Sequence, residues 1–98
     1  MSPRRAARVD ANQAEIVEAF RKCGWWVVLT HQVGQFLPGF PDLLCVPPRK
    51  PCVTYFVEVK RPGEKLNANE QVFGATCPAP YLVVRTVEDV LSVTADLT

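Results

Sequence analysis

The sequence contains no long uncharged apolar run, no export-type leader and no excess of one charge. Its longest uncharged stretch, residues 23–41, is interrupted by histidine, glutamine and glycine, so we expect no transmembrane helix. No apolar segment follows the basic residues near the N-terminus, which argues against a secretory signal. Eleven Lys and Arg against ten Asp and Glu give a net charge of +1, which excludes a uniformly basic nucleic-acid coat.

Cysteine pairs with metal-ligand spacing are also absent. The four cysteines form no CxxC pattern and no zinc-type arrangement. Because we expect no export, we interpret them as reduced thiols of a cytoplasmic protein. The one alternative is a disulfide between Cys45 and Cys52, which flank a turn and would face each other across a hairpin.

The composition that is present is typical of one small globular domain. The chain has 98 residues, of which 48% are hydrophobic and 21% are charged. We expect residues 1–9 to form a flexible basic arm and residues 10–98 to form the domain. The first helix should begin near Asp10 or Asn12, because each is followed three residues later by Gln or Glu, as in a capping box.

Helical and strand patterns follow one another in the order αβββαβα. Apolar spacing and capping signals predict helices over residues 10–23, 67–76 and 86–93. Asn67 with Glu70 and Thr86 with Asp89 have capping-box spacing at the last two starts. Aromatic and β-branched runs predict strands over residues 25–30, 42–46, 53–60 and 81–85. This order predicts an α/β fold with a central mixed sheet flanked by helices, the second and third strands antiparallel and the third and fourth parallel.

The end of the third strand carries two charged residues. Glu58 and Lys60 are two residues apart, so they share one face of an otherwise apolar strand. Asp42 follows Pro41 at the start of the neighbouring strand, and antiparallel pairing would bring it beside both. Taken singly, Glu-x-Lys is an ordinary strand-end ion pair and Asp an ordinary loop cap, so the argument depends on their combination.

Two carboxylates this close favour a bound cation. At a separation of about 5 Å and an effective dielectric constant of about 20, they repel each other by roughly 3 kcal/mol. Oxygen ligands without His or Cys suit Mg²⁺, with Mn²⁺ as a substitute. We therefore expect a metal at Asp42 and Glu58, with the backbone carbonyl of Val59 as a further ligand. A metal there, with Lys60 alongside, would activate a water and stabilise charge on a phosphate.

These residues form a recognisable pattern. The segments Gly39-Phe40-Pro41-Asp42 and Glu58-Val59-Lys60, with Gln71 on the following helix, resemble the VRR-NUC branch of the PD-(D/E)xK nuclease superfamily. This branch is related to archaeal-type Holliday junction resolvases. The resemblance runs over about residues 10–93 and implies a restriction-endonuclease-like fold and metal-dependent cleavage of DNA. It further implies that Lys60 orients the water or stabilises charge, and that Gln71 lies near the catalytic site.

Nucleases of this kind often add a glutamate from the first helix, and Glu15 and Glu18 are the two available. At about 100° per residue, Glu15 lies on the flank of the apolar face centred near Phe20, whereas Glu18 lies nearly opposite. We favour Glu15 as a further catalytic and metal-binding residue. The alternatives are Glu18, or two solvated side chains of which Glu15 only closes the capping box.

Contacts with DNA are expected from polar residues beside the site. Arg61 and Lys65 follow the third strand and would contact phosphates of a duplex. His31 is the only histidine and follows the first strand. It is either a further DNA contact or a polar loop residue without a role.

The resemblance therefore predicts an endonuclease of phage or prophage origin that cleaves branched or four-way DNA. We expect a homodimer, because one site cuts one strand and a junction requires two symmetric cuts. Unless the 31–41 loop folds back over the sheet, an interface could use apolar residues: Trp25 or Trp26, Phe36, Leu37 and Phe40. The alternatives are a catalytically silent DNA-binding or assembly module and a restriction-type nuclease subunit.

Overall fold

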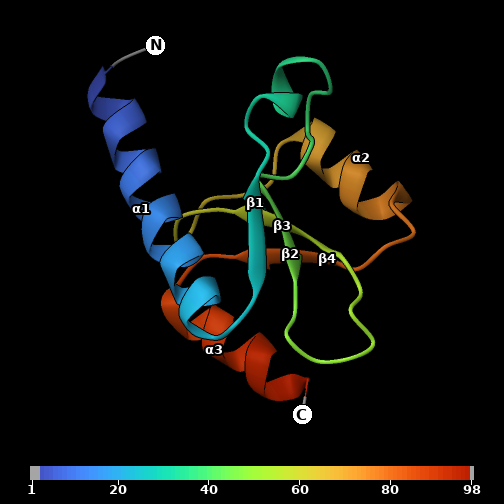
Figure 1. The fold of residues 1–98 in the computed structure, drawn as a ribbon. Coiled ribbons are helices and arrows are strands. Elements are labelled where there is room, and N and C mark those ends of the chain that lie inside the picture. The colour runs from blue at the N-terminus through green and yellow to red at the C-terminus, as the bar shows by residue number, and fades with distance from the viewer. Residues whose placement is uncertain (1–2, 98) are drawn as a thin grey trace.

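The computed structural model describes residues 3–97 of the chain. Its elements follow the predicted order αβββαβα, and a short 3₁₀ helix, η1, is added in the loop after the first strand (Figure 1). The helices are α1 (Pro3–Lys22), α2 (Ala68–Thr76) and α3 (Val87–Asp96). The strands are β1 (Trp26–Leu29), β2 (Leu43–Val46), β3 (Tyr55–Val59) and β4 (Tyr81–Val84), and η1 spans Val33–Gln35.

The four strands form one mixed sheet in the order β1-β2-β3-β4. β2 is antiparallel to β1 and to β3, with Leu43 opposite Val57. β3 and β4 are parallel, with Phe56 opposite Tyr81. The predicted antiparallel pair and parallel crossover are therefore confirmed. This register matters for the site, because it places Asp42, which precedes Leu43, opposite Glu58, which follows Val57.

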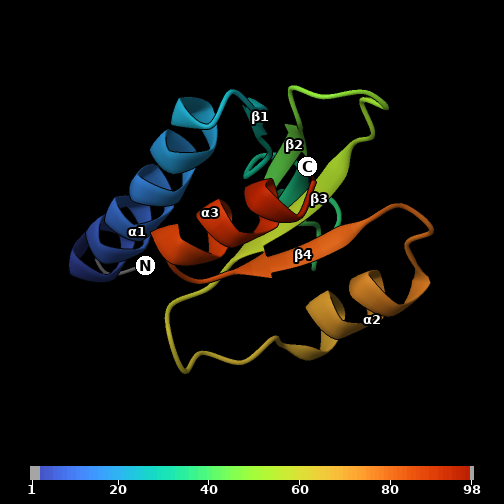
Figure 2. The same cartoon turned by 90° about the horizontal axis from the view of Figure 1, so that it is seen from below.

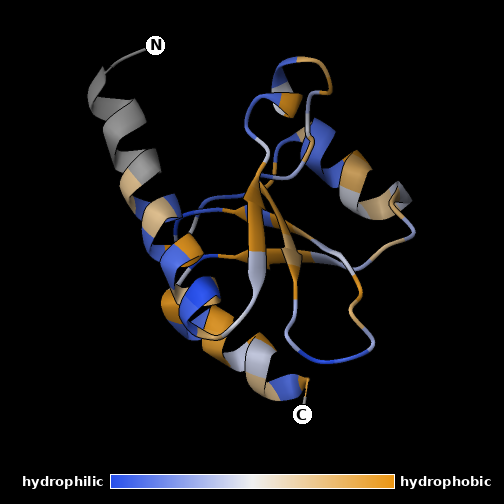
Figure 3. Cartoon of the chain, in the orientation of Figure 1, coloured by the Kyte–Doolittle hydropathy of each residue, from blue (hydrophilic) through white to orange (hydrophobic). Residues whose placement is uncertain are grey.

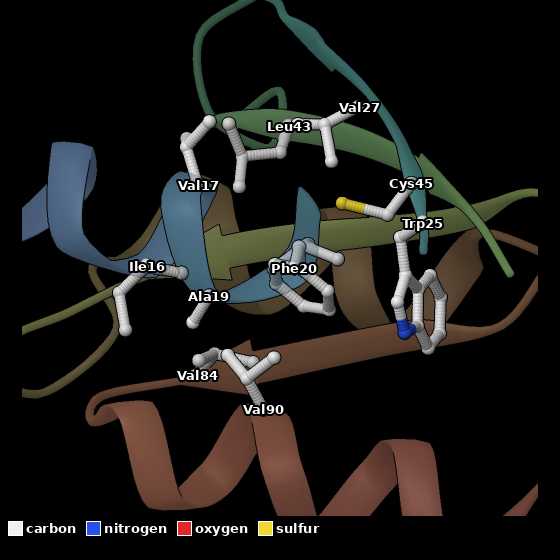
Figure 4. Close-up of a cluster of buried hydrophobic side chains, with 11 residues drawn as sticks. Ile16, Val17, Ala19, Phe20, Trp25, Val27, Leu43, Cys45, Val84 and Val90 are labelled. Carbon is white, nitrogen blue, oxygen red and sulfur yellow. The ribbon is translucent and has the colours of Figure 1, made fainter. Parts of the chain in front are cut away.

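The sheet separates two layers of helix. α1 and α3 cover one face and α2 covers the other (Figure 2). The face beneath α1 and α3 carries the main core, in which Phe20, Leu43 and Val90 are fully buried (Figure 4). Burial of each such side chain contributes roughly 1.5–3 kcal/mol. The strands are accordingly mostly apolar, whereas the connecting loops carry many of the polar residues (Figure 3).

The opposite face of the sheet holds a smaller aromatic cluster. The rings of Phe40, Phe56 and Phe73 pack edge to face, with centroids 5.4–5.9 Å apart. This cluster holds α2 and the end of the 31–41 loop against the sheet. Phe40 is therefore part of the fold and not spare interface surface, whereas Phe36 and Leu37 are exposed.

The start of α1 differs from the prediction. The helix begins at Pro3, so the expected start near Asp10 or Asn12 is wrong. The alanines and arginines of residues 4–8 favour helix, and proline is well tolerated in a first turn. The side chain of Asn12 donates from Nδ2 to the Lys60 carbonyl, with an N···O distance of 3.5 Å. The flexibility of residues 1–9 stays a prediction, and residues 1–2 lie outside the described part.

Three smaller predictions are decided by the structure. Trp25 is buried and Trp26 is exposed, as the alternation of a strand requires. Cys45 and Cys52 are free thiols, so the alternative of a disulfide between them is wrong. Within residues 3–97, no helix has both the length and the apolar character needed to cross a membrane.

Candidate active site

Asp42 and Glu58 meet at one end of the sheet. Asp42 immediately precedes β2, and the strand register places it opposite Glu58 of β3. Asp42 Oδ2 accepts a hydrogen bond from the backbone N–H of Val59 at 2.8 Å, which holds the carboxylate across the two strands. The structure therefore brings together the two carboxylates for which the sequence predicts a shared site.

The segment before Asp42 explains why its residue types are needed. Gly39 has a φ of +88°, and a Cβ at this position would lie 2.5 Å from the backbone of Asn69 in α2. Thr30 donates from Oγ1 to the Pro41 carbonyl and from its backbone N–H to the Asp42 carbonyl. These contacts fix the backbone of Asp42 against both β1 and α2.

Glu58 is buried without full hydrogen bonding. The residue is 3% exposed, and among the described residues its Oε1 has no hydrogen-bond partner. Burial, hydrogen bonding with Asp42 and the negative charges of Asp42 and Glu70 raise the pKa of Glu58 from 4.5 to about 10. Without a cation, this carboxyl is protonated at neutral pH. A cation beside it would take the place of that proton.

Lys60 is buried next to Glu58 and has a matched partner. Its Nζ lies 2.8 Å from Glu70 Oε1 and 3.0 Å from Glu70 Oε2. Burial acts to lower the pKa of Lys60, but the hydrogen bond and charge of Glu70 outweigh it and raise the pKa above 10.5. Burial likewise acts to raise the pKa of Glu70, but Lys60 and the Asn67 backbone outweigh it and lower the pKa below 4.5. Both groups are therefore charged at neutral pH.

These groups line one polar pocket of about 160 Å³. A water molecule occupies about 30 Å³, and pockets for organic ligands start at about 300 Å³. The volume therefore suits a hydrated ion or a phosphate group. The walls come from α1, the strand ends, the turn after β3 and α2: Asn12, Gln13, Asp42, Glu58, Val59, Lys60, Arg61, Glu64 and Glu70.

A larger groove of about 590 Å³ lies between α1 and β1 and shares only Gln13 with this pocket. Its charged residues are solvated, and Glu18 pairs with Lys22 at 3.2 Å. No pair of carboxylates converges among its lining residues, so we place the functional site in the smaller pocket.

Not all of the expected site residues reach the pocket. Those that line it are Asp42, Glu58, Val59, Lys60 and Arg61. Those that do not are Glu15, Gln71, Lys65 and His31, all of which are exposed.

The placements of Glu15 and Gln71 have simple geometric reasons. α1 turns Asn12 and Gln13 toward the pocket and Ile16 into the core, which leaves Glu15 outside the pocket, on a neighbouring groove that Asn12 also lines. On α2, Glu70 faces the pocket, so the next residue points away from it. The side chain of Gln71 instead donates from Nε2 to the Leu66 carbonyl at 3.0 Å.

Glu70 is the main site residue that sequence reasoning missed. The predicted capping box at the start of α2 is confirmed: Glu70 N–H donates to Asn67 Oδ1 at 2.9 Å, and Asn67 N–H donates to Glu70 Oε1 at 2.8 Å. The cap fully accounts for a glutamate at this position. The only further signal was its place beside Gln71, a residue of the recognised pattern. Asn12, Gln13 and Glu64 were also missed as pocket residues.

The donor set fits a divalent cation. Two carboxylates converge, one of them has an unpartnered buried oxygen, and Lys60 is already neutralised by Glu70. A metal would be held by Asp42 and Glu58, with the carbonyl of Val59 as the further expected ligand. Within residues 3–97, no three His, Cys, Asp or Glu side chains form a metal-type cluster. An ion would therefore take its remaining ligands from backbone, water or substrate oxygens.

An acidic pair and a lysine at the ends of the central strands of a small α/β domain are typical of enzymes that cleave phosphodiester bonds. The model of the VRR-NUC domain family matches residues 4–77. A solved structure described as a VRR_NUC domain is similar to this chain, with a TM-score of 0.65 and 25% sequence identity. The similarity covers 91% of this chain and 96% of the other. A comparison with curated proteins finds no match.

The chain belongs to the VRR-NUC domain family, a branch of the PD-(D/E)xK nuclease superfamily. The resemblance expected from the sequence is confirmed, and so is the fold. Membership of this family implies a nuclease and, with it, the binding of DNA.

Proposed function

We propose that the protein is a Mg²⁺-dependent endonuclease that hydrolyses DNA phosphodiester bonds, with Mn²⁺ as an effective substitute. The observation that carries this proposal is the pairing of half-buried Asp42 with buried Glu58, whose Oε1 has no partner among the described residues, next to the charged Lys60. Membership of a nuclease family supports the reaction, and the all-oxygen donor set supports the class of metal.

Four residues of the pocket have defined roles in this proposal. Asp42 and Glu58 hold the ion, which supplies an activated water and stabilises charge on the phosphate. Lys60 presents a permanent positive charge to the charge that develops during cleavage. Because its pKa is raised above 10.5, Lys60 is not the general base at neutral pH. Arg61, exposed at the rim of the pocket, binds a neighbouring phosphate.

We further propose that the preferred substrate is branched DNA, such as a four-way junction, and that the active form is a homodimer. The chain has a radius of gyration of 13.2 Å, so a single pocket reaches one strand while a junction needs two symmetric cuts. Trp26, Phe36 and Leu37 are exposed apolar residues that suit the centre of an interface. The cytoplasmic location and the phage or prophage origin stay predictions.

The test is cleavage of linear, nicked, flap and four-way DNA of matched sequence, with Mg²⁺ or with EDTA. Asp42→Asn is the matched variant, because asparagine can still accept the Val59 N–H. The proposal predicts metal-dependent cleavage by the wild-type chain, fastest on four-way DNA, and cleavage about 1,000-fold slower by the variant. Intact DNA with both Mg²⁺ and Mn²⁺ would favour the silent binding module, and cleavage in EDTA would exclude the metal.

Light scattering tests the assembly separately. The proposal predicts a species of twice the 10.9 kDa chain mass at micromolar concentration. A 10.9 kDa species, both alone and with four-way DNA, would contradict the homodimer and the paired cuts.

A further inference from the structure

One carboxylate, that of Glu70, makes two sets of contacts. It closes the capping box of α2 by accepting the Asn67 N–H at 2.8 Å. Both of its oxygens also lie within 3.0 Å of Lys60 Nζ. Glu70 and Lys60 are each 9% exposed, so solvent contributes little to either charge and the contact between them dominates.

These contacts leave the Lys60 side chain little freedom. A solvated lysine samples many rotamers along its flexible stem. The backbone of Lys60 is held by its N–H bond to the Val84 carbonyl at 3.0 Å, but this does not fix the ammonium. The next acidic atom, Glu64 Oε2, is 3.9 Å from Nζ, beyond hydrogen-bond distance. Glu70 is thus the group that determines where the ammonium lies.

We propose that Glu70 is the positioning residue of Lys60: the α2 capping box fixes Glu70, and Glu70 holds the Lys60 ammonium in the pocket beside Glu58. The proposal rests on the proposed nuclease function, because the position of the ammonium matters only if it faces a reacting phosphate. The start of α2 then controls the geometry of cleavage, and a displacement of about 1 Å would lower the rate by about 100-fold.

Glu70→Gln separates the two roles of this residue. Glutamine at the third position of a capping box still accepts the backbone N–H, but it loses the charge that pairs with Lys60. Asp89→Asn is the matched control. Asp89 closes the other capping box, accepts the N–H groups of Arg85 and Thr86 at 2.8 and 3.1 Å, and lies outside the pocket. Both variants remove one negative charge from the third position of a helix capping box, Glu70→Gln in α2 and Asp89→Asn in α3.

Two measurements read the effect. NMR relaxation of lysine Cε atoms in the metal-free protein should show Lys60 rigid in the wild type and in Asp89→Asn. In Glu70→Gln, Lys60 should become clearly more mobile, toward the level of the exposed Lys50, because the amide lacks the charge and the second oxygen that hold the ammonium. On the best-cleaved DNA, Glu70→Gln should lower kcat by about 10- to 100-fold with KM within about twofold, whereas Asp89→Asn should match the wild type.

Either of two results overturns the proposal: a Lys60 side chain that stays rigid in Glu70→Gln, or a kcat that is unchanged or higher in that variant. Should Glu70→Gln fail to fold, the relaxation data of the wild-type protein alone test the proposal. A wild-type Lys60 side chain as mobile as that of Lys50 would show that Glu70 does not hold the ammonium in place. Absence of cleavage by the wild-type chain would instead reject the nuclease function, and the relaxation data would still report whether Glu70 holds Lys60.

Discussion

The two sides of the pocket handle charge in opposite ways. On one side, Asp42 and Glu58 face each other, and burial together with the neighbouring carboxylates raises the pKa of Glu58 to about 10. On the other side, Lys60 and Glu70 are matched, and each keeps the other ionised. Both pairs line one pocket, and Glu58, Lys60 and Glu70 are all buried, so burial alone does not explain the difference.

This difference indicates how the work of the site is divided. A buried charge without a partner destabilises the fold, so an uncompensated carboxylate pair in a cleft points to a role that needs a cation. A matched pair needs no further ligand and is suited to hold a fixed positive charge. The carboxylate side is therefore the candidate metal site, and the lysine side is the candidate for stabilising charge on the phosphate.

Removing the carboxylate side should have the largest effect. Asp42→Asn deletes one metal ligand, and we expect cleavage to fall by about 1,000-fold, at the upper end for loss of a transition-state contact. The fold should persist, because the amide oxygen replaces the acceptor of the Val59 N–H. Single-turnover cleavage and thermal melting in EDTA measure the two effects. Activity within about tenfold of the wild type would remove Asp42 from the metal site.

Removing the lysine should affect both activity and stability. Lys60→Met should lower kcat by about 100-fold. It should also reduce the free energy of unfolding by about 1–3 kcal/mol, because Glu70 is left buried and unpaired. Urea denaturation measures the second effect.

The double variant Lys60→Met/Glu70→Gln isolates the cost of that unpaired charge. It should regain most of the stability but none of the activity, because neutralising both partners of a buried pair is often tolerated. A double variant no more stable than Lys60→Met would show that the ion pair is not the cause.

Replacing Glu58 by a neutral residue should change how the free energy of unfolding depends on pH. Its folded-state pKa is raised from 4.5 to about 10, so its contribution to stability is fully present below about pH 4.5 and is lost as the pH rises toward 10. Glu58→Gln removes this loss. In EDTA, the variant should gain stability over the wild type as the pH rises, by roughly 1–3 kcal/mol at alkaline pH. A difference that does not change between acidic and alkaline pH would contradict the raised pKa.

The smallest effect concerns which residue of α1 serves the pocket. Asn12→Ala should lower cleavage by about two- to tenfold, because it loses a hydrogen bond to the Lys60 carbonyl. Glu15→Ala should stay near the wild type, because Glu15 lines a different groove. The opposite ranking in matched cleavage assays would restore Glu15 as the helix carboxylate.

The predictable part of the site depends on short-range rules. Strand alternation put Glu58 and Lys60 on one face, and the antiparallel pairing of neighbouring strands brought Asp42 to them. The contribution of α1 depends instead on how its apolar face docks on the sheet, which a helical wheel does not resolve between Asn12 and Glu15. The contact of Glu70 with Lys60 depends on how α2 packs against the face of the sheet opposite α1 and α3. The capping-box spacing of α2 carries no information about that packing, so the sequence alone could not reveal the contact.

The central claim is that a divalent cation occupies the Asp42–Glu58 pair, and calorimetry of Mn²⁺ binding tests it most directly. Titrations at neutral pH in buffers of different ionisation enthalpy count the protons that binding releases. Because Glu58 is protonated at neutral pH in the metal-free protein, we predict that Mn²⁺ binding releases about one proton. In Asp42→Asn, both the Mn²⁺ binding and the proton release should be lost. Binding without proton release, or binding of unchanged affinity to Asp42→Asn, would contradict the account.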